Sequence, residues 1–108
     1  KSLEFAVRIV NLYKFLVNEQ KEFVMSKQIL RSGTSIGANI REAEQAQSRA
    51  DFINKLNIAL KEANETEYWL ELLIRTEYIT REQYESINND STEINKLLIS
   101  IIKTTKNN

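Results

Sequence analysis

The feature that most constrains this chain is its near lack of residues that break helices. Its 108 residues include no proline and only two glycines, so long helices can form without interruption. Apolar residues recur at alternating steps of three and four along four segments, which is the spacing of one face of an α-helix. The pattern predicts helices over residues 2–18, 26–46, 48–75 and 80–104.

Polar residues mark the start of each predicted helix. Ser2, Ser26 and Ser48 are placed as N-caps, because a serine hydroxyl can accept a hydrogen bond from a free N–H of the first turn. Thr80 and Gln83 are spaced as a capping box for the last helix. Residues 88–92 are weak helix formers, but the apolar spacing keeps its phase across them. We therefore predict one last helix, with room for a local bend there.

Each predicted helix carries one apolar seam. An antiparallel up-down-up-down four-helix bundle is the all-α fold that buries four such seams with short connections. The chain length suits a single domain over residues 1–108. The seams consist of Phe5, Ile9, Leu12 and Leu16; Ile29, Gly33, Ile36, Ile40 and Ala43; Phe52, Leu56, Ala59, Ala63, Thr66, Leu70 and Leu73; and Tyr84, Ile87, Ser91, Ile94, Leu98 and Ile101.

The composition argues against catalysis. Without cysteine or histidine, the chain has no thiolate nucleophile, no imidazole base and no ordinary zinc ligand set. A di-iron bundle site would need two Glu-x-x-His pairs, and two glycines cannot make a glycine-rich phosphate loop. The acidic residues Glu62, Glu65 and Glu67 lie mostly off the third seam and are expected to be solvated. We expect no enzyme activity, no catalytic residue, no metal and no cofactor.

The two glycines lie four residues apart in the second predicted helix, at Gly33 and Gly37. Each costs about 1 kcal/mol relative to alanine within a helix, which suggests that a neighbouring backbone comes close at this point. The contact would lie between helices of one bundle or, for Gly37, between subunits. Asn39 lies beside the seam and needs a hydrogen-bond partner. It would either fix the helix register or contact a ligand.

A family resemblance rests on two motifs in this region. Residues 35–43 read Ser-Ile-Gly-Ala-Asn-Ile-Arg-Glu-Ala, and residues 58–66 read Ile-Ala-Leu-Lys-Glu-Ala-Asn-Glu-Thr. Both resemble the four-helix-bundle family of 23S rRNA intervening-sequence proteins, which is related to the accessory bundle proteins of diversity-generating retroelements. The resemblance implies a bacterial helical bundle that assembles as a homo-oligomer, with a pentamer favoured.

The charges cancel in number but not in order. The net charge is zero overall, yet residues 1–61 carry +4, residues 62–93 carry −7 and residues 94–108 carry +3. In an antiparallel bundle the acidic block falls at one pole. The opposite pole is predicted to hold Lys1, Arg8, Arg41, Arg49, Lys55, Lys96, Lys103 and Lys106.

This polarity supports two hypotheses of function. In the first, an oligomer binds RNA or DNA phosphates through Arg41, Arg49 and Lys55, which surround the turn between the second and third helices. Few aromatic rings lie at the basic pole, so such binding would have little sequence preference. In the second, the bundle is a scaffold or accessory subunit that binds a protein partner and no nucleic acid.

Apolar residues beside the seams favour self-association. They widen the apolar stripes beyond a narrow coiled-coil seam, and we therefore predict a homo-oligomer. The residues are Phe15, Leu30, Ile53, Leu60, Trp69, Ile74, Leu97 and Ile102. No apolar run approaches the roughly 20 residues that span a bilayer, and the first residues show no export signal. We expect a soluble, cytoplasmic protein.

Overall fold

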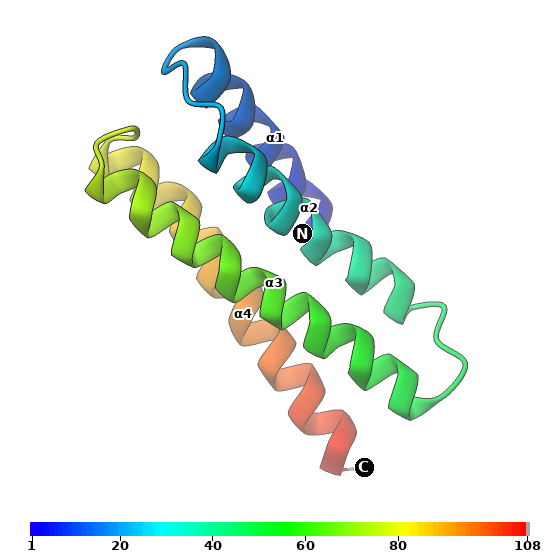
Figure 1. Cartoon of the computed structure of the whole chain (residues 1–108). Helices are drawn as coiled ribbons and strands as arrows, with labels where there is room; N and C mark the ends of the chain where they lie inside the picture. Colours follow the sequence, from blue (N-terminus) through cyan, green and yellow to red (C-terminus); the bar gives the residue numbers. More distant parts are fainter. Residues whose placement is uncertain (108) are drawn as a thin grey trace.

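A computed structural model describes residues 1–107 of the chain and contains four helices and no strand within that range. They are α1 (Ser2–Asn18), α2 (Met25–Ala43), α3 (Arg49–Arg75) and α4 (Arg81–Asn107). Consecutive helices run in opposite directions, and the last one returns to the end where α2 meets α3 (Figure 1). The predicted all-α four-helix bundle is confirmed.

The helix boundaries agree closely with the periodicity. α2 ends at Ala43 rather than residue 46, because the chain tightens there: the N–H groups of Gln45 and Ala46 donate to carbonyls only three residues back. α4 runs without a break through residues 88–92. The low helix propensity of that segment is overcome by tertiary packing, because Ile87, Ser91 and Ile94 are all buried in the core.

One cluster of buried apolar side chains connects all four helices, and it follows the predicted seams with few changes. Ile102, rather than Ile101, supplies the last core position of α4; Ile101 is exposed. The core comprises Phe5, Ile9, Leu16, Ile29, Ile36, Ala43, Leu56, Ala59, Ala63, Leu70, Leu73, Ile79, Ile87, Ile94, Leu98 and Ile102. Residues at a fixed spacing along a long helix gradually rotate around its axis, because an α-helix does not repeat after a whole number of residues. This rotation accounts for the shift of the core position by one residue near the end of α4.

A layer of small hydroxyl residues crosses the middle of this core. Ser32 of α2, Thr66 of α3 and Ser91 of α4 are completely buried. The Thr66 hydroxyl lies 3.0 Å from Ser32 Oγ and 2.8 Å from the Glu62 carbonyl oxygen. Ser91 donates to the Glu67 carboxylate at 3.3 Å, and Asn95 donates to the same oxygen at 2.7 Å. The layer therefore contains two separate sets of hydrogen bonds, one between α2 and α3 and one between α3 and α4.

Two of the predicted caps are present and two are not. The Asp51 N–H donates to Ser48 Oγ at 3.1 Å, and Thr80 and Gln83 form the reciprocal capping box at 2.8 and 3.1 Å. Ser2 and Ser26 instead lie inside their helices, and neither helix has a side-chain cap from its N-cap residue. For α2 the Glu22 carboxylate, from the preceding loop, takes that role.

The molecule is elongated, with extents of 46 × 20 × 18 Å, and α1 and α4 touch each other least of the neighbouring helix pairs. We call the end that holds the α1–α2 loop (residues 19–24) and the α3–α4 turn (residues 76–80) the turn end. The other end, which we call the basic end, holds the α2–α3 loop (residues 44–48) and the C-terminal half of α4 (Figure 1).

Candidate nucleic-acid interface

The predicted phosphate-binding residues lie together around the α2–α3 loop. Arg41 is in the last turn of α2, Arg49 is the first residue of α3, and Lys55 follows within the second turn of α3. Arg41 and Arg49 are exposed, and neither forms an ion pair with any residue that the structure describes. Both guanidinium groups are therefore free to bind an anion.

Lys55 differs from the two arginines. Its Nζ lies 2.9 Å from the Glu42 carboxylate of α2. The hydrogen bond and the charge of Glu42 raise the pKa of Lys55 and keep it ionised, but they also neutralise its positive charge. At the start of α3, the Ser48 hydroxyl already accepts the Asp51 N–H, and the Asp51 carboxylate opposes an incoming phosphate. The unpaired positive charge of this corner therefore lies on Arg41 and Arg49.

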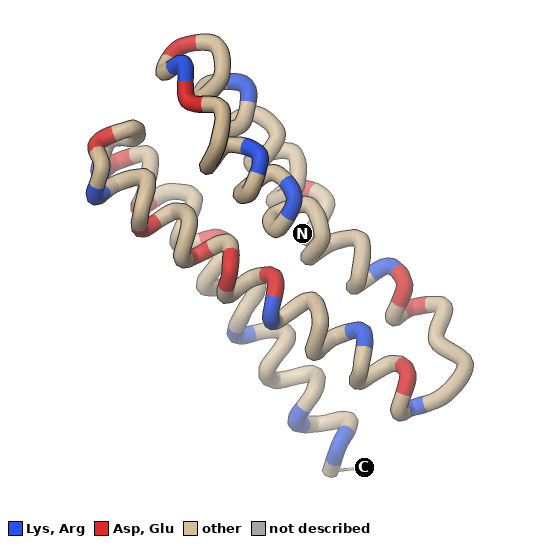
Figure 2. Tube along the Cα trace, viewed as in Figure 1, with Lys and Arg blue, Asp and Glu red and all other residues tan. Residues whose placement is uncertain are grey.

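The C-terminal half of α4 adds free positive charge to the same end. Lys96, Lys103 and Lys106 are exposed and form no ion pair within residues 1–107. Glu93 is the last acidic residue of the chain. Figure 2 shows this half of α4 with blue segments and no red one.

Two residues assigned to the basic pole from the sequence lie elsewhere. Arg8 Nη1 is 2.6 Å from Asp90 and its Nη2 is 2.8 Å from Ser86 Oγ, while Lys1 pairs with Glu93. These contacts join α1 to α4 midway along the bundle. Lys1 and Arg8 lie away from the pole because α1 is ten residues shorter than α4 and begins beside the middle of it.

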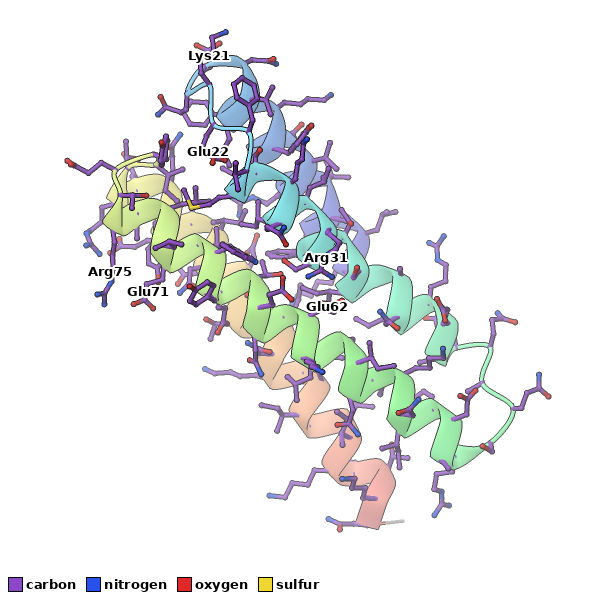
Figure 3. The ribbon with its side chains drawn as sticks, in the orientation of Figure 1. Lys21, Glu22, Arg31, Glu62, Glu71 and Arg75 are labelled. Atoms are coloured by element: carbon purple, nitrogen blue, oxygen red, sulfur yellow. The ribbon has the colours of Figure 1, made fainter. Side chains whose placement is uncertain are left out.

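The acidic block of α3 is not simply solvated either. Arg31 of α2 lies between two carboxylates of α3, at 3.1 Å from Glu62 and in contact with Glu65 (Figure 3). Trp69 Nε1 donates to Glu65 at 3.0 Å. The hydrogen bond from Arg31, followed by that from Trp69, lowers the pKa of Glu65. The expectation of solvated glutamates was wrong because Glu62 and Glu65 lie on the flank of α3 that faces α2, while Glu67 accepts hydrogen bonds from Ser91 and Asn95 of α4.

Ion pairs within the chain therefore leave the unpaired charges unevenly distributed along the bundle. Six of the nine acidic residues in residues 62–93 take part in ion pairs, including the pairs within one helix between Arg75 and Glu71 at 2.8 Å and between Arg81 and Glu85 at 3.9 Å. At the basic end Lys55 alone is paired among the described cations. The excess of unpaired cations over unpaired carboxylates is thus concentrated at the basic end, although the chain is neutral.

Gly33, Gly37 and Asn39 lie on α2 without forming a common site. A Cβ atom at Gly33 would lie 2.7 Å from Ile9 Cγ1, so α1 packs tightly against α2 at this glycine. At Gly37 the nearest atom would be the Ser2 carbonyl oxygen, at an ordinary 3.4 Å. Asn39 is half-buried and donates to the Ser35 carbonyl at 2.8 Å, one turn back in its own helix.

Most apolar residues predicted to favour self-association pack against the core instead. Of that set Leu97 is exposed, Ile102 is buried, and the other six are half-buried on the flanks of their helices. A four-helix bundle uses these flanking positions between neighbouring helices. The large exposed apolar residues of the described chain are Leu3, Val7, Phe23, Val24, Tyr68, Leu97, Ile99 and Ile101.

Residues 1–107 contain no cluster of three acidic, histidine or cysteine side chains arranged to hold a metal ion. In the same range, none of the helices combines the length and apolar character needed to cross a bilayer.

Comparison with known proteins identifies the family. Residues 1–100 match the 23S rRNA-intervening sequence protein family. The chain belongs to this family. A crystal structure of a protein of unknown function from the S23 ribosomal protein family of Bacteroides thetaiotaomicron VPI-5482 is 98% identical to it, with a TM-score of 0.90 over 94% of this chain and 87% of the other. None of the proteins with curated descriptions matches the chain.

Proposed function

We propose that this member of the 23S rRNA-intervening sequence protein family is a non-enzymatic, cytoplasmic homo-oligomer that associates with RNA or DNA through its basic end. The observation that carries the proposal is the distribution of unpaired charge. Arg41, Arg49 and the three lysines of α4 are exposed and free of intramolecular carboxylates, whereas most acidic residues between 62 and 93 are already paired.

The expected contact is with the phosphate backbone. Guanidinium groups bind phosphate oxygens in a bidentate geometry, and each neutralised phosphate makes the affinity depend on salt. The large exposed aromatic residues, Phe23 and Tyr68, lie away from the basic end, so base stacking is not available there. Little sequence preference should result.

Oligomerisation would make this contact effective. A single basic end offers few cations, and a ring of parallel subunits, for which the family resemblance favours five, would add them into one face. Linked contacts raise the overall affinity well above that of each one.

Charge reversal tests the proposal. In a filter-binding or fluorescence-anisotropy assay at low salt, Arg41→Glu with Arg49→Glu should weaken binding at least tenfold and flatten the dependence of affinity on salt. Lys55→Glu should have a smaller effect, because Glu42 already neutralises Lys55. The matched control is Arg75→Glu with Arg81→Glu at the turn end, which should change affinity less than twofold.

The main alternative is a scaffold or accessory subunit that binds a protein partner and no nucleic acid. The wild-type protein would then bind neither RNA nor DNA at low salt, or the Arg41/Arg49 variant would bind as well as the wild type. Either result would contradict the nucleic-acid proposal and favour the protein-binding scaffold.

A further inference from the structure

Two consecutive apolar residues at the turn end are exposed. Phe23 is 52% and Val24 is 72% exposed, in the loop between α1 and α2. We call this pair the Phe-Val knob. Together the two consecutive residues form a small exposed apolar patch that remains available to a partner.

The loop that carries the knob is held rigidly. Glu22 is 8% exposed, and its carboxylate accepts hydrogen bonds from the N–H groups of Val24, Met25 and Ser26 at 3.1, 2.9 and 2.7 Å. Lys21 adopts a left-handed backbone with φ of 54° and points away from the bundle, while Glu22 points towards the start of α2 (Figure 3). Gln20 donates to the Tyr78 carbonyl at 2.8 Å, which ties the loop to the α3–α4 turn. The knob is therefore ordered before any partner arrives, and binding costs little entropy.

A groove of matching chemistry lies between α1 and α4, the least tightly packed pair of neighbouring helices. It is open to solvent, has a volume of about 550 Å³, and lies towards the turn end. Its apolar lining is Leu12 and Phe15 from α1 with Ile79 and Ile87 from the turn and α4. Its polar lining includes Gln83 and two charged residues, Glu82 and Arg8, of which Arg8 is already paired with Asp90.

The charges beside the knob and beside the groove are opposite. Lys21 and Lys27 flank the knob in sequence, are exposed, and have no ion pair among residues 1–107. Glu82 lines the groove and Glu77 lies in the adjacent turn, and both are likewise exposed and unpaired in that range. Glu19, which is also exposed and unpaired in that range, lies near the knob in sequence and offsets part of its positive charge. Among the exposed unpaired residues, the net charge is thus positive beside the knob and negative beside the groove.

We propose that the Phe-Val knob of one subunit occupies the α1–α4 groove of a second copy of this chain. This rests on the homo-oligomer of the proposed function and names the surface that builds it. The knob and the groove are different surfaces at the same end of the molecule, so a repeated head-to-tail contact joins parallel subunits at one level and can close into a ring. The basic ends then all lie on the same face, away from the contact.

The test measures the mass of the full chain by sedimentation or light scattering at micromolar concentration. Phe23→Ser with Val24→Ser should shift the protein towards the mass of one chain, 12.6 kDa, without loss of helix content. The matched control is Tyr68→Ser, because Tyr68 is an exposed aromatic residue of similar exposure, 60%, on the outer side of α3. That control should keep the wild-type mass.

Charge exchange provides a second measurement that does not depend on the apolar residues. Lys27→Glu and Glu82→Lys should each raise the dissociation constant of the oligomer several-fold, and the double variant should restore much of the loss by exchanging the two charges. Thermal unfolding of each variant checks that a changed charge in the first turn of α2 or α4 has not altered the stability of the fold.

The outcomes separate this inference from the proposed function. A wild-type protein that is monomeric overturns both the knob contact and the proposed oligomer. An oligomer that survives Phe23→Ser/Val24→Ser but is lost in Leu3→Ser/Val7→Ser, on the exposed face of α1, overturns the knob contact alone. Binding of RNA or DNA is measured independently of either result.

Discussion

At the turn end, Gln20 and Glu22 bond to backbone groups and hold two loops together, whereas at the basic end Arg41 and Arg49 extend into solvent unpaired. The buried polar groups of the turn end stabilise the fold, whereas the exposed arginines of the basic end have no carboxylate of their own chain to pair with. A chain with no net charge can still present a charged surface, because ion pairs remove charge from one region and leave it in another. Total charge is therefore a poor guide to what such a bundle binds.

The largest expected effect is at the turn end. Glu22→Ala removes an acceptor for three backbone N–H groups at the start of α2, and should lower the free energy of unfolding by about 2–3 kcal/mol in urea denaturation. Glu22→Gln, which keeps one acceptor oxygen, should lose less. A loss below about 0.5 kcal/mol for the alanine variant would mean that water replaces the carboxylate.

The same residue predicts a dependence on pH. Burial opposes ionisation of Glu22, but the hydrogen bonds from Met25, Ser26 and Val24 outweigh it and lower its pKa. The stabilisation is therefore complete above the unfolded-state pKa of about 4.3 and is lost as the pH falls through the lower folded value. Glu22→Ala should show a weaker decline in stability than the wild type below pH 4.5.

A smaller effect compares the packing of α1 on α2 at two points. Gly33→Ala forces a methyl group against Ile9, which is fully buried, and should cost about 1–2 kcal/mol. Gly37→Ala, one turn closer to the basic end, meets an ordinary contact and should leave stability unchanged or raise it by up to about 1 kcal/mol, since alanine favours the helix. Thermal unfolding of the two variants measures the difference, and equal losses would contradict a tight contact at Gly33 alone.

The smallest effects separate paired from unpaired arginines. Arg41→Ala and Arg49→Ala should change the free energy of unfolding by less than about 0.5 kcal/mol. Arg31→Ala leaves Glu62 and Glu65 without their cation and should cost about 1 kcal/mol. A stability loss at Arg41 or Arg49 as large as that at Arg31 would show that the basic end is not free of internal contacts.

Sequence reasoning was most successful where the cause is local. The four helices follow from apolar spacing, and the caps at Ser48 and Thr80 need only residues within one turn. The Glu22 cap was missed because it depends on the left-handed conformation of Lys21, which no spacing rule indicates. The pairs of Arg8 with Asp90 and of Arg31 with Glu62 were missed because they depend on the axial offset and rotation of packed helices. The sequence predicted a basic end, but not which of its cations are free.

The buried hydroxyl layer has a consequence for how the helices find their alignment. If α3 slid along α2 by one helical turn, about 5.4 Å, Thr66 would leave Ser32 and face an apolar side chain, and the Ser32 oxygen would lose its donor. Each mismatch of this kind costs about 1–3 kcal/mol in a dry core, in addition to any loss of apolar packing. Ser32 and Thr66 thus add a polar penalty to sliding states, beyond the penalty that the packing of leucines and isoleucines imposes.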